Sequence, residues 1–290
     1  MTALAFRPAP PVTAVGVVVP AHDEQDRIGR CLISLRRALA QVPDGITTAA
    51  AVVLDRCTDA TPERVADLVA DWPQATVLTL PGDRPAPRSA DLISIARHGL
   101  RGTGIGAVRD LGLRAVLQQL SGRPTAGTWL LSTDADTTVP PDWVRAHLRH
   151  AADGVHAVAG LADLATTDHL ATGALWRYRS IVEHGLHGAT HHHVYGANLG
   201  VRADAYLAVG GFPADGSGED HGLWRRLAAA CYTLVQPVGI RVRTSARLRG
   251  RADGGLAGLL RALHRDDPRD DQGDDRAAGH RAGDAVCDGA

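Results

Sequence analysis

The chain of 290 residues contains no lysine, so all 31 of its basic residues are arginine. They are balanced by 32 acidic residues, and a formal net charge of -1 creates no field that would attract nucleic acid or an anionic membrane. The 4 cysteines are far apart, without the close spacing of a zinc knuckle or the density of a disulfide framework. We therefore expect a cytoplasmic protein that does not bind nucleic acid.

Long apolar runs are also missing. No stretch approaches the length of a membrane span, and residues 1–11 lack the charged-then-apolar order of a signal peptide. Any contact with a membrane would therefore be peripheral. The chain is nevertheless 44% hydrophobic, which is enough to bury the core of one large domain, or of one domain with an appendage.

Short apolar runs alternate with segments of helical periodicity. Strands are predicted at residues 15–19, 49–54, 75–80 and 128–132, with another near 155–161. Helices are predicted at residues 24–39, 61–69 and 107–120, and from residue 140 onward. Continuous apolar strands that alternate with helices predict a parallel sheet covered on both faces. We interpret residues 81–106, rich in Pro, Arg and Gly, as a mobile loop, and the pattern becomes less regular after residue 161.

Two carboxylates one residue apart, Asp134 and Asp136, follow the apolar run that ends at Ser132. Hard cations take oxygen ligands, and Mg²⁺ is usually held by one or two carboxylates together with substrate phosphates. The predicted cofactor is therefore Mg²⁺ or Mn²⁺, and the predicted ligand is a nucleoside diphosphate. An isolated Asp-x-Asp pair is also common in turns, so this prediction depends on its surroundings.

Other acids follow the first two predicted strands: Asp23 and Glu24 after one, Asp55 and Asp59 after the other. In open parallel sheets, ligands bind outside the carboxyl ends of the strands, where these acids would gather. A single acid at such a place is as often a turn former or a helix cap, and this interpretation stays open for Asp23 and Asp59.

A second pair of acids, Glu219 and Asp220, lies between Gly218 and a helical run. One interpretation is a helix N-terminus, where acids interact favourably with the helix dipole. The other makes Asp220 a general base, whose pKa would be raised by burial or by its acidic neighbour.

These stretches, with others along the chain, resemble family 2 glycosyltransferases of the GT-A fold, from about Val15 to about Ala262. The sequence departs from the family pattern in each of its first three motifs. The departures are His22-Asp23 in place of Tyr-Asn, Arg56-Cys57 in place of Gly-Ser, Val108 in place of Ala and Asp110 in place of Asn. Several motifs in the family's order are more specific than any one alone. In chain order they are Pro20 to Glu24, Asp55 to Thr61, Gly104 to Gly112, Asp134 with Asp136, Gly196 to Asn198, and Glu219 with Asp220.

The resemblance implies an α/β fold of GT-A type, with a mostly parallel, nucleotide-binding sheet flanked by helices and a less regular acceptor-side half. It implies one domain over residues 12–264, divided into a nucleotide-sugar-binding half (12–138) and an acceptor-binding half (139–264). Residues 265–290 contain almost no large apolar side chain, which is typical of a disordered tail.

The resemblance also implies a metal-dependent, inverting transfer of a hexose from a nucleotide-diphosphate sugar, a UDP-sugar by family default, to an acceptor hydroxyl. Asp220 with Glu219 would be catalytic, and Asp136 with Asp134 would hold the metal. The implied donor-binding residues are Pro20, His22, Glu24, Asp55, Arg109 and Asp134. The implied acceptor-side residues are Gly196, Ala197 and Asn198, to which we add Trp176 as a surface for stacking on a carbohydrate.

The family's processive members carry a Gln-x-x-Arg-Trp motif and membrane helices, and this sequence contains neither. We therefore expect non-processive transfer to a small-molecule or lipid-linked acceptor. Two other functions stay open. A sugar-phosphate nucleotidyltransferase would carry a glycine-rich, basic loop after the first strand, whereas residues 20–26 are acidic. A non-catalytic nucleotide-sugar-binding protein would keep the fold without turnover. The cluster His191 to His193 is either a further contact to the ligand or solvated surface.

Overall fold

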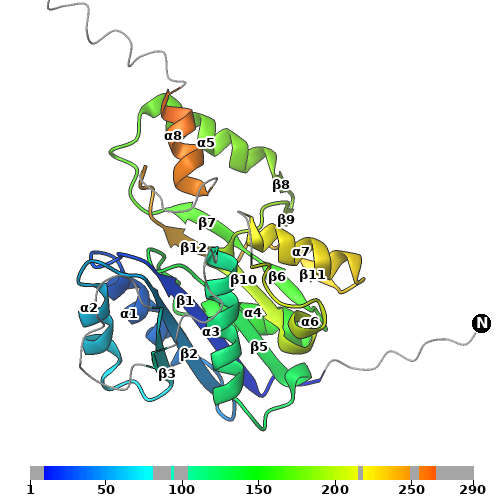
Figure 1. Ribbon diagram of the computed structural model, residues 1–290. Coiled ribbons are helices and arrows are strands. Elements are labelled where there is room, and N and C mark those ends of the chain that lie inside the picture. Colours follow the sequence, from blue (N-terminus) through cyan, green and yellow to red (C-terminus); the bar gives the residue numbers. More distant parts are fainter. Residues whose placement is uncertain (1–9, 81–92, 95–103, 215–217, 249–254, 266–290) are drawn as a thin grey trace, which may run out of the picture.

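The computed structural model describes residues 10–80, 93–94, 104–214, 218–248 and 255–265. Its centre is a sheet of eight strands in the order β11-β6-β10-β5-β1-β2-β3-β4 (Figure 1). Within the described residues, β10 is the only strand of this sheet that pairs antiparallel with its neighbours. The strands are β1 (Ala14–Ala21), β2 (Thr47–Asp55), β3 (Ala75–Leu80), β4 (Ile93–Ser94), β5 (Thr128–Ser132), β6 (Ala157–Ala159), β10 (Leu199–Arg202) and β11 (Leu234–Val235).

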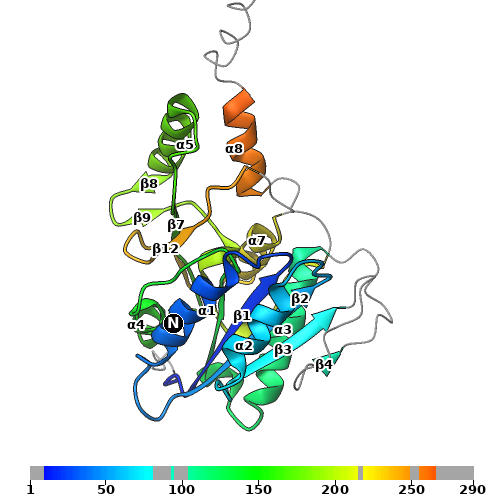
Figure 2. The ribbon, with the colours of Figure 1, turned by 90° about the vertical axis from the view of Figure 1, so that its left-hand side faces the viewer.

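Helices cover both faces of this sheet, as its continuous apolar strands require. On β1, Val15, Val17 and Val19 face one helical layer, whereas Ala14 and Val18 face the other. The first layer contains α1 (Ile28–Leu39), α2 (Thr61–Val69) and α4 (Trp143–Ala152). The second layer contains α3 (Ile105–Gln119), α6 (Ala203–Ala208) and α7 (Glu219–Ala229) (Figures 1 and 2). The expected fold class, a mostly parallel sheet flanked by helices, is confirmed.

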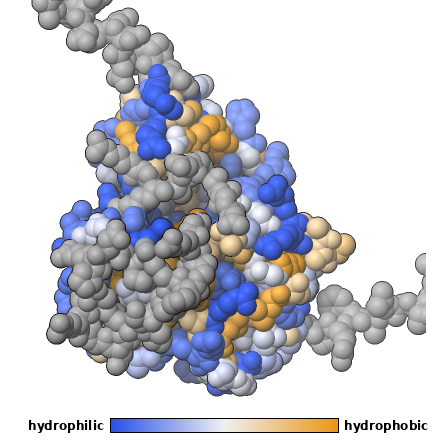
Figure 3. Space-filling model, viewed as in Figure 1, coloured by the Kyte–Doolittle hydropathy of each residue, from blue (hydrophilic) through white to orange (hydrophobic). Residues whose placement is uncertain are grey.

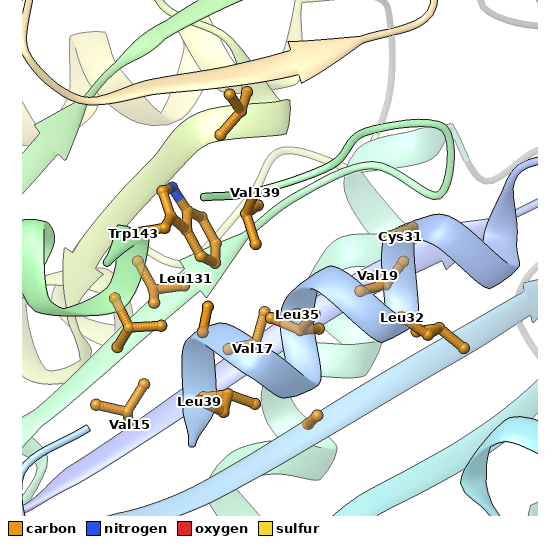
Figure 4. Packing of buried hydrophobic residues seen from close by; sticks show 14 of the residues in the cluster. Val15, Val17, Val19, Cys31, Leu32, Leu35, Leu39, Leu131, Val139 and Trp143 are labelled. Carbon is orange, nitrogen blue, oxygen red and sulfur yellow. The ribbon is translucent and has the colours of Figure 1, made fainter. Parts of the chain in front are cut away.

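Helix α1 shows how the apolar periodicity builds the first layer. Leu32, Leu35 and Leu39 recur at helical spacing and lie against Val17 and Val19 of β1 (Figure 4). Each of these leucines is buried, and burying one contributes about 1.5–3 kcal/mol. These contacts hold α1 against β1 and so fix the turn that joins them.

Helix α3 approaches the sheet closely because it carries glycine where it crosses β1 and β2. A Cβ at Gly112 would lie 2.3 Å from Cγ2 of Val18 and 2.8 Å from Cγ2 of Val53. No larger residue fits without moving the helix. The close approach positions Arg109, one turn earlier, at the edge of the sheet where the parallel strands end.

A second group of elements lies beyond that edge. Helices α5 (Thr172–His184) and α8 (Leu256–Arg265) share a small apolar core that includes Tyr178 and Leu260 (Figure 1). Apolar patches are visible around these helices at the top of Figure 3. The remaining elements are the parallel pair β7 (Leu161–Leu164) and β12 (Arg241–Thr244), the hairpin β8 (Leu186–His187) and β9 (Thr190–His191), and the 3₁₀ turns η1 (Thr125–Gly127) and η2 (Gly196–Asn198).

Several predicted boundaries differ from the structure. Strand β1 continues past residue 19 through Pro20 to Ala21, and the helix expected from residue 24 begins at Ile28. The strand expected at 155–161 is two strands, β6 and β7, separated at Gly160. The predicted loop at 81–106 contains β4 and the start of α3, while its residues 81–92 and 95–103 lie outside the described part. So does nearly all of the predicted tail, of which Arg265 ends α8.

No helix within the described ranges is long and apolar enough to cross a membrane.

Candidate functional site

The turns after β1 and β2 are held together by two aspartates. The Asp23 carboxylate accepts hydrogen bonds from the backbone N–H groups of Thr58 and Asp59, at 2.5 and 3.2 Å. The Asp59 carboxylate accepts from the N–H groups of Gln25 and Thr61, at 3.1 and 2.9 Å. Asp23 and Asp59 are therefore turn formers, which was the simpler of the two interpretations of their sequence positions.

The same turns bring together two predicted donor-binding residues. Nδ1 of His22 donates to the backbone carbonyl of Asp55 at the end of β2. Both carboxylate oxygens of Asp55 accept from Arg56, at 2.8 Å from Nε and 2.9 Å from Nη2. Arg56 lies in the left-handed region with φ of 50°, where the family pattern has glycine. Asp55 and Arg56 thus form one paired unit beside His22, while Pro20 is buried within β1.

Asp136 lies in the loop after β5 and is largely buried. Its Oδ1 accepts from Oγ1 of Thr244 at 3.3 Å, and its Oδ2 is 3.2 Å from Nη2 of Arg247. Nη1 of Arg247 also bonds Oε1 of Glu24. Burial and the nearby charge of Asp134 raise the pKa of Asp136 to about 6, although Arg247 opposes the shift.

The carboxylates of Glu24, Asp134 and Asp136 suit a hard divalent cation. All three act electrostatically on the buried Cys31 thiol, whose pKa is raised by burial and by these charges, so they lie in one neighbourhood. Among the described residues, no group of three or more His, Cys, Asp or Glu side chains that could hold a metal ion is found. This donor set fits Mg²⁺ or Mn²⁺ shared with phosphate oxygens, and it does not fit a closed protein cage.

Arg109 of α3 is the central residue of the site. Its Nη2 donates to Oδ1 of Asp134 at 2.6 Å, and its Nε donates to Oε1 of Glu219 at 3.2 Å. Its Nη1 donates to Oγ of Ser132 at 2.7 Å and to the carbonyl of Gly196 at 3.3 Å. Burial lowers the pKa of the guanidinium, but Asp134 and Glu219 raise it more, so Arg109 stays charged. One side chain that is only 4% exposed thus joins α3 to three segments far apart in the sequence.

The acidic pair at the start of α7 divides into a buried and an accessible member. Burial raises the pKa of Glu219 above its ordinary value, Arg109 opposes this shift, and Asp220 adds to it. Oδ2 of Asp220 accepts from the N–H of Gly196 at 2.9 Å, and its Oδ1 accepts from the N–H of His221 at 2.7 Å. The N-cap residue of α7 is Gly218, which forms no side-chain cap bond. The acidic pair bonds the first turn of the helix at His221 and, outside the helix, Arg109 and the loop of Gly196.

Gly196 has no room for a side chain. A Cβ at this position would lie 2.7 Å from Nη2 of Arg109 and 2.9 Å from its Cζ. The backbone of Gly196 therefore packs directly on the guanidinium plane, with its carbonyl toward Arg109 and its N–H toward Asp220. This glycine connects the predicted acceptor-side segment to the predicted base.

The other predicted acceptor-side residues are placed differently. Asn198 is fully buried, and its amide bonds Trp143, His147 and the carbonyls of Leu161 and Ile240, so its side chain holds the loop in place. Ala197 is buried beside it. Trp176 is 69% exposed on α5, and no hydrogen bond, ion pair or ring contact within the described residues links it to the Arg109 cluster.

The histidine cluster begins at the end of the β8–β9 hairpin, and its members differ in burial, since His192 is exposed and His193 is partly buried. The ring of His193 stacks on Tyr195 with centroids 5.6 Å apart, and His191 is buried. Burial, together with the nearby His193, lowers the pKa of His191 to about 4, which keeps its imidazole neutral near pH 7. Neither His191 nor His193 has a described contact with the acidic residues around Arg109.

Sequence reasoning missed Arg247 and Ser132 as members of the site. Arg247 is one of several arginines in the stretch after Arg241, and nothing in its spacing distinguishes it from the others. Ser132 was assigned only to a strand. Its position as the last residue of β5 does place it at the ligand-binding edge, which is the one signal that could have identified it.

Comparisons with known proteins bear on the fold. No protein-family model matches the chain, and no curated protein matches it. A mannosyltransferase of Pyrobaculum calidifontis, PcManGT, solved with GDP-Man and Mn²⁺, is similar with a TM-score of 0.53. The two are 17% identical over 89% of this chain and 69% of PcManGT.

TarS of S. aureus is similar to the same extent. Its fragment 1–349 has a TM-score of 0.53 and 12% identity, over 80% of this chain and 60% of the fragment. The same fragment in complex with UDP-GlcNAc has a TM-score of 0.52 and 14% identity. This chain therefore spans less than two thirds of the TarS fragment. At such identities the likeness establishes a fold shared with these structures.

Proposed function

We propose that this protein is a metal-dependent, inverting glycosyltransferase that moves a hexose from a nucleotide-diphosphate sugar to an acceptor hydroxyl. The observation that carries the proposal is the bonding of Arg109. It joins Asp134, from the predicted metal and donor pair, to Glu219, from the predicted catalytic pair, and to the backbone of Gly196. Three motifs with separate predicted roles thus share one buried cation at the carboxyl ends of the parallel strands.

On the donor side, His22 and the Asp55 unit would contact the nucleobase, and Asp134 would contact the ribose or the metal. Asp136, with Asp134, would hold Mg²⁺ or Mn²⁺ on the diphosphate. When bound, the cation would offset the charge that develops on the departing nucleoside diphosphate. The likeness to structures solved with GDP-Man and with UDP-GlcNAc supports a nucleotide sugar as ligand, and leaves the base and the sugar open.

At the reaction centre, Asp220 would accept the proton of the acceptor hydroxyl. The acceptor oxygen then forms a bond to the anomeric carbon as the bond from that carbon to the phosphate oxygen breaks, which inverts the configuration in one displacement. The N–H groups of Gly196 and His221 fix the Asp220 carboxylate. Such fixed geometry is what a general base requires. Glu219, the other member of the predicted catalytic pair, is held by Arg109.

The acceptor side is formed by the loop of Gly196 and by the group of elements around α5 and α8. The exposed ring of Trp176 would stack on a sugar or another flat group of the acceptor. We propose a small-molecule or lipid-linked acceptor and transfer without processivity.

The direct test is release of nucleoside diphosphate from a panel of UDP-, GDP- and ADP-hexoses, with Mn²⁺ or Mg²⁺. We expect Asp136→Ala and Asp220→Asn to reduce turnover by at least about a hundredfold, the scale of a lost general base. Asp71→Asn is a matched control, because Asp71 is an exposed partner of Arg36. Wild-type turnover in both site variants would contradict the mechanism.

The alternatives predict different products. A sugar-phosphate nucleotidyltransferase would release pyrophosphate from a nucleoside triphosphate and a sugar phosphate. A binding protein would retain a nucleotide sugar without turning it over against any acceptor. Either result would replace the proposed function.

A further inference from the structure

We propose that Arg247 is a ligand of the donor diphosphate and that it competes with the cation for the carboxylates of Asp136 and Glu24. The inference extends the proposed function above and rests on it. It concerns a residue outside every motif, in the connection that follows β12.

Arg247 links the segments that follow two different strands. Its Nη2 is 3.2 Å from Oδ2 of Asp136, after β5, while its Nη1 bonds Oε1 of Glu24, after β1. The other oxygen of Asp136 accepts from Oγ1 of Thr244. Both oxygens of Asp136 already accept a contact, so a cation that binds Asp136 competes with Arg247 for the same carboxylate.

The guanidinium that withdraws is well suited to phosphate. A planar arginine fork binds phosphate oxygens in pairs, as it binds carboxylates. Arg247 lies outside regular secondary structure and has a long side chain that is partly exposed, so its head group can turn without disturbing the sheet. A metal-bound diphosphate would bring phosphate oxygens next to Asp136, within reach of the group that has just been displaced.

This arrangement couples metal binding to donor binding. Without donor, Arg247 competes with the metal for Asp136, so metal affinity is low. With donor, Arg247 exchanges its carboxylate partners for phosphate, and the competition ends. The expected consequence is that removal of Arg247 shifts the two affinities in opposite directions, which loss of a purely structural ion pair would not do.

The experiment measures binding by calorimetry, independently of turnover. The first arm titrates Mn²⁺ alone into wild-type protein and into Arg247→Gln, and we expect the variant to bind Mn²⁺ at least about tenfold more tightly. The second arm titrates UDP, GDP, ADP and CDP at saturating Mn²⁺, and we expect the variant to bind the preferred nucleotide at least about tenfold more weakly. Each tenfold change corresponds to about 1.4 kcal/mol.

Arg243→Gln is the matched control, because Arg243 is an exposed arginine of β12 and its loss removes the same charge. The control should leave both affinities within about twofold of wild type, well below the tenfold step. If Arg247→Gln does not fold, Arg247→Lys replaces it, since a single ammonium group cannot reproduce the fork, and smaller shifts of the same signs are expected.

Opposite shifts in Arg247→Gln support the inference. Unchanged Mn²⁺ affinity, or shifts in the same direction, would overturn it. Failure of wild-type protein to bind any nucleotide of the panel would refute the proposed function instead, while the Mn²⁺ arm would still decide whether Arg247 competes for Asp136.

Discussion

Replacing Arg109 by methionine should destabilise the fold strongly. Among the contacts of the described residues, Arg109 is the one positive charge that pairs with both Asp134 and Glu219. Arg109 is 4% exposed and forms four hydrogen bonds, two of them to carboxylates. Methionine fills much of the same volume without the charge, so the cost reflects lost electrostatics rather than a cavity.

The magnitude follows from the burial of the partners. Glu219 is buried and Asp134 partly so, and removal of one member of a buried ion pair costs about 3–5 kcal/mol. For a domain of this size, each kcal/mol lowers Tm by about 2–4 °C, so the expected decrease in Tm is roughly 6–20 °C. Part of the loss should be recovered in Arg109→Met with Glu219→Gln, because the second change neutralises a carboxylate that the first leaves unpaired.

Urea denaturation followed by circular dichroism gives the free energy of unfolding for the single and double variants. Arg114→Gln is the control on the same helix, since Arg114 is half exposed and pairs with Asp110 at i,i+4, a type of contact that contributes about 0.3–0.5 kcal/mol. A loss below about 1 kcal/mol in Arg109→Met, equal to that of the control, would refute the view of Arg109 as the organising charge of the site.

Three further predictions concern single positions. Burial lowers the pKa of His147 to about 3, so the folded state binds fewer protons than the unfolded state below pH 6.5, and its contribution to stability should fall as the pH falls. Between pH 7.5 and pH 5, the free energy of unfolding from denaturant melts should decrease by about 2 kcal/mol less in His147→Gln than in wild type. Equal decreases in the two proteins would contradict the assignment. Gly196→Ala should cost about 1–3 kcal/mol through its clash with Arg109, and this cost should shrink when Arg109 is already methionine, as a double-mutant cycle would measure. Trp176→Ala should leave the free energy of unfolding within about 0.5 kcal/mol of wild type, because the ring is exposed, while raising KM for the acceptor; a large loss of stability would show that the ring is part of the core.

The sheet could be predicted from sequence because its strands and helices carry strong local signals. Residues 49–54 are a continuous apolar run, residues 128–132 centre on Trp129, Leu130 and Leu131, and α1 repeats leucine at helical spacing. Parallel strands then place the residues that follow them at one edge, which is why the shared neighbourhood of Glu24, Asp134 and Asp136 could be anticipated. Boundaries were less accurate at Pro20, where strand pairing with Val53 outweighs the usual preference of proline for strand ends.

The interior bonding of the site could not be predicted, because it depends on residues distant in sequence. Arg109 and Glu219 are 110 positions apart, and Arg247 and Glu24 are 223 apart, so no local pattern reports their contact. Asn198 illustrates a related difficulty. A polar residue in an acceptor-side motif looks available for a ligand, yet the amide of Asn198 is hydrogen-bonded to buried protein groups.

The reversed direction of β10 has a consequence for how such a site can change. Because β10 runs opposite to β5 and β6, the chain reaches their ligand-binding edge on its way into β10, through residues 196–198, after crossing α5 and the β8–β9 hairpin. Its register is anchored by Leu199 opposite Ser132 and Ala159. Insertions or changed sequence between residues 165 and 190 would therefore alter what the chain presents beside residues 196–198, while the strand register across the sheet stayed the same.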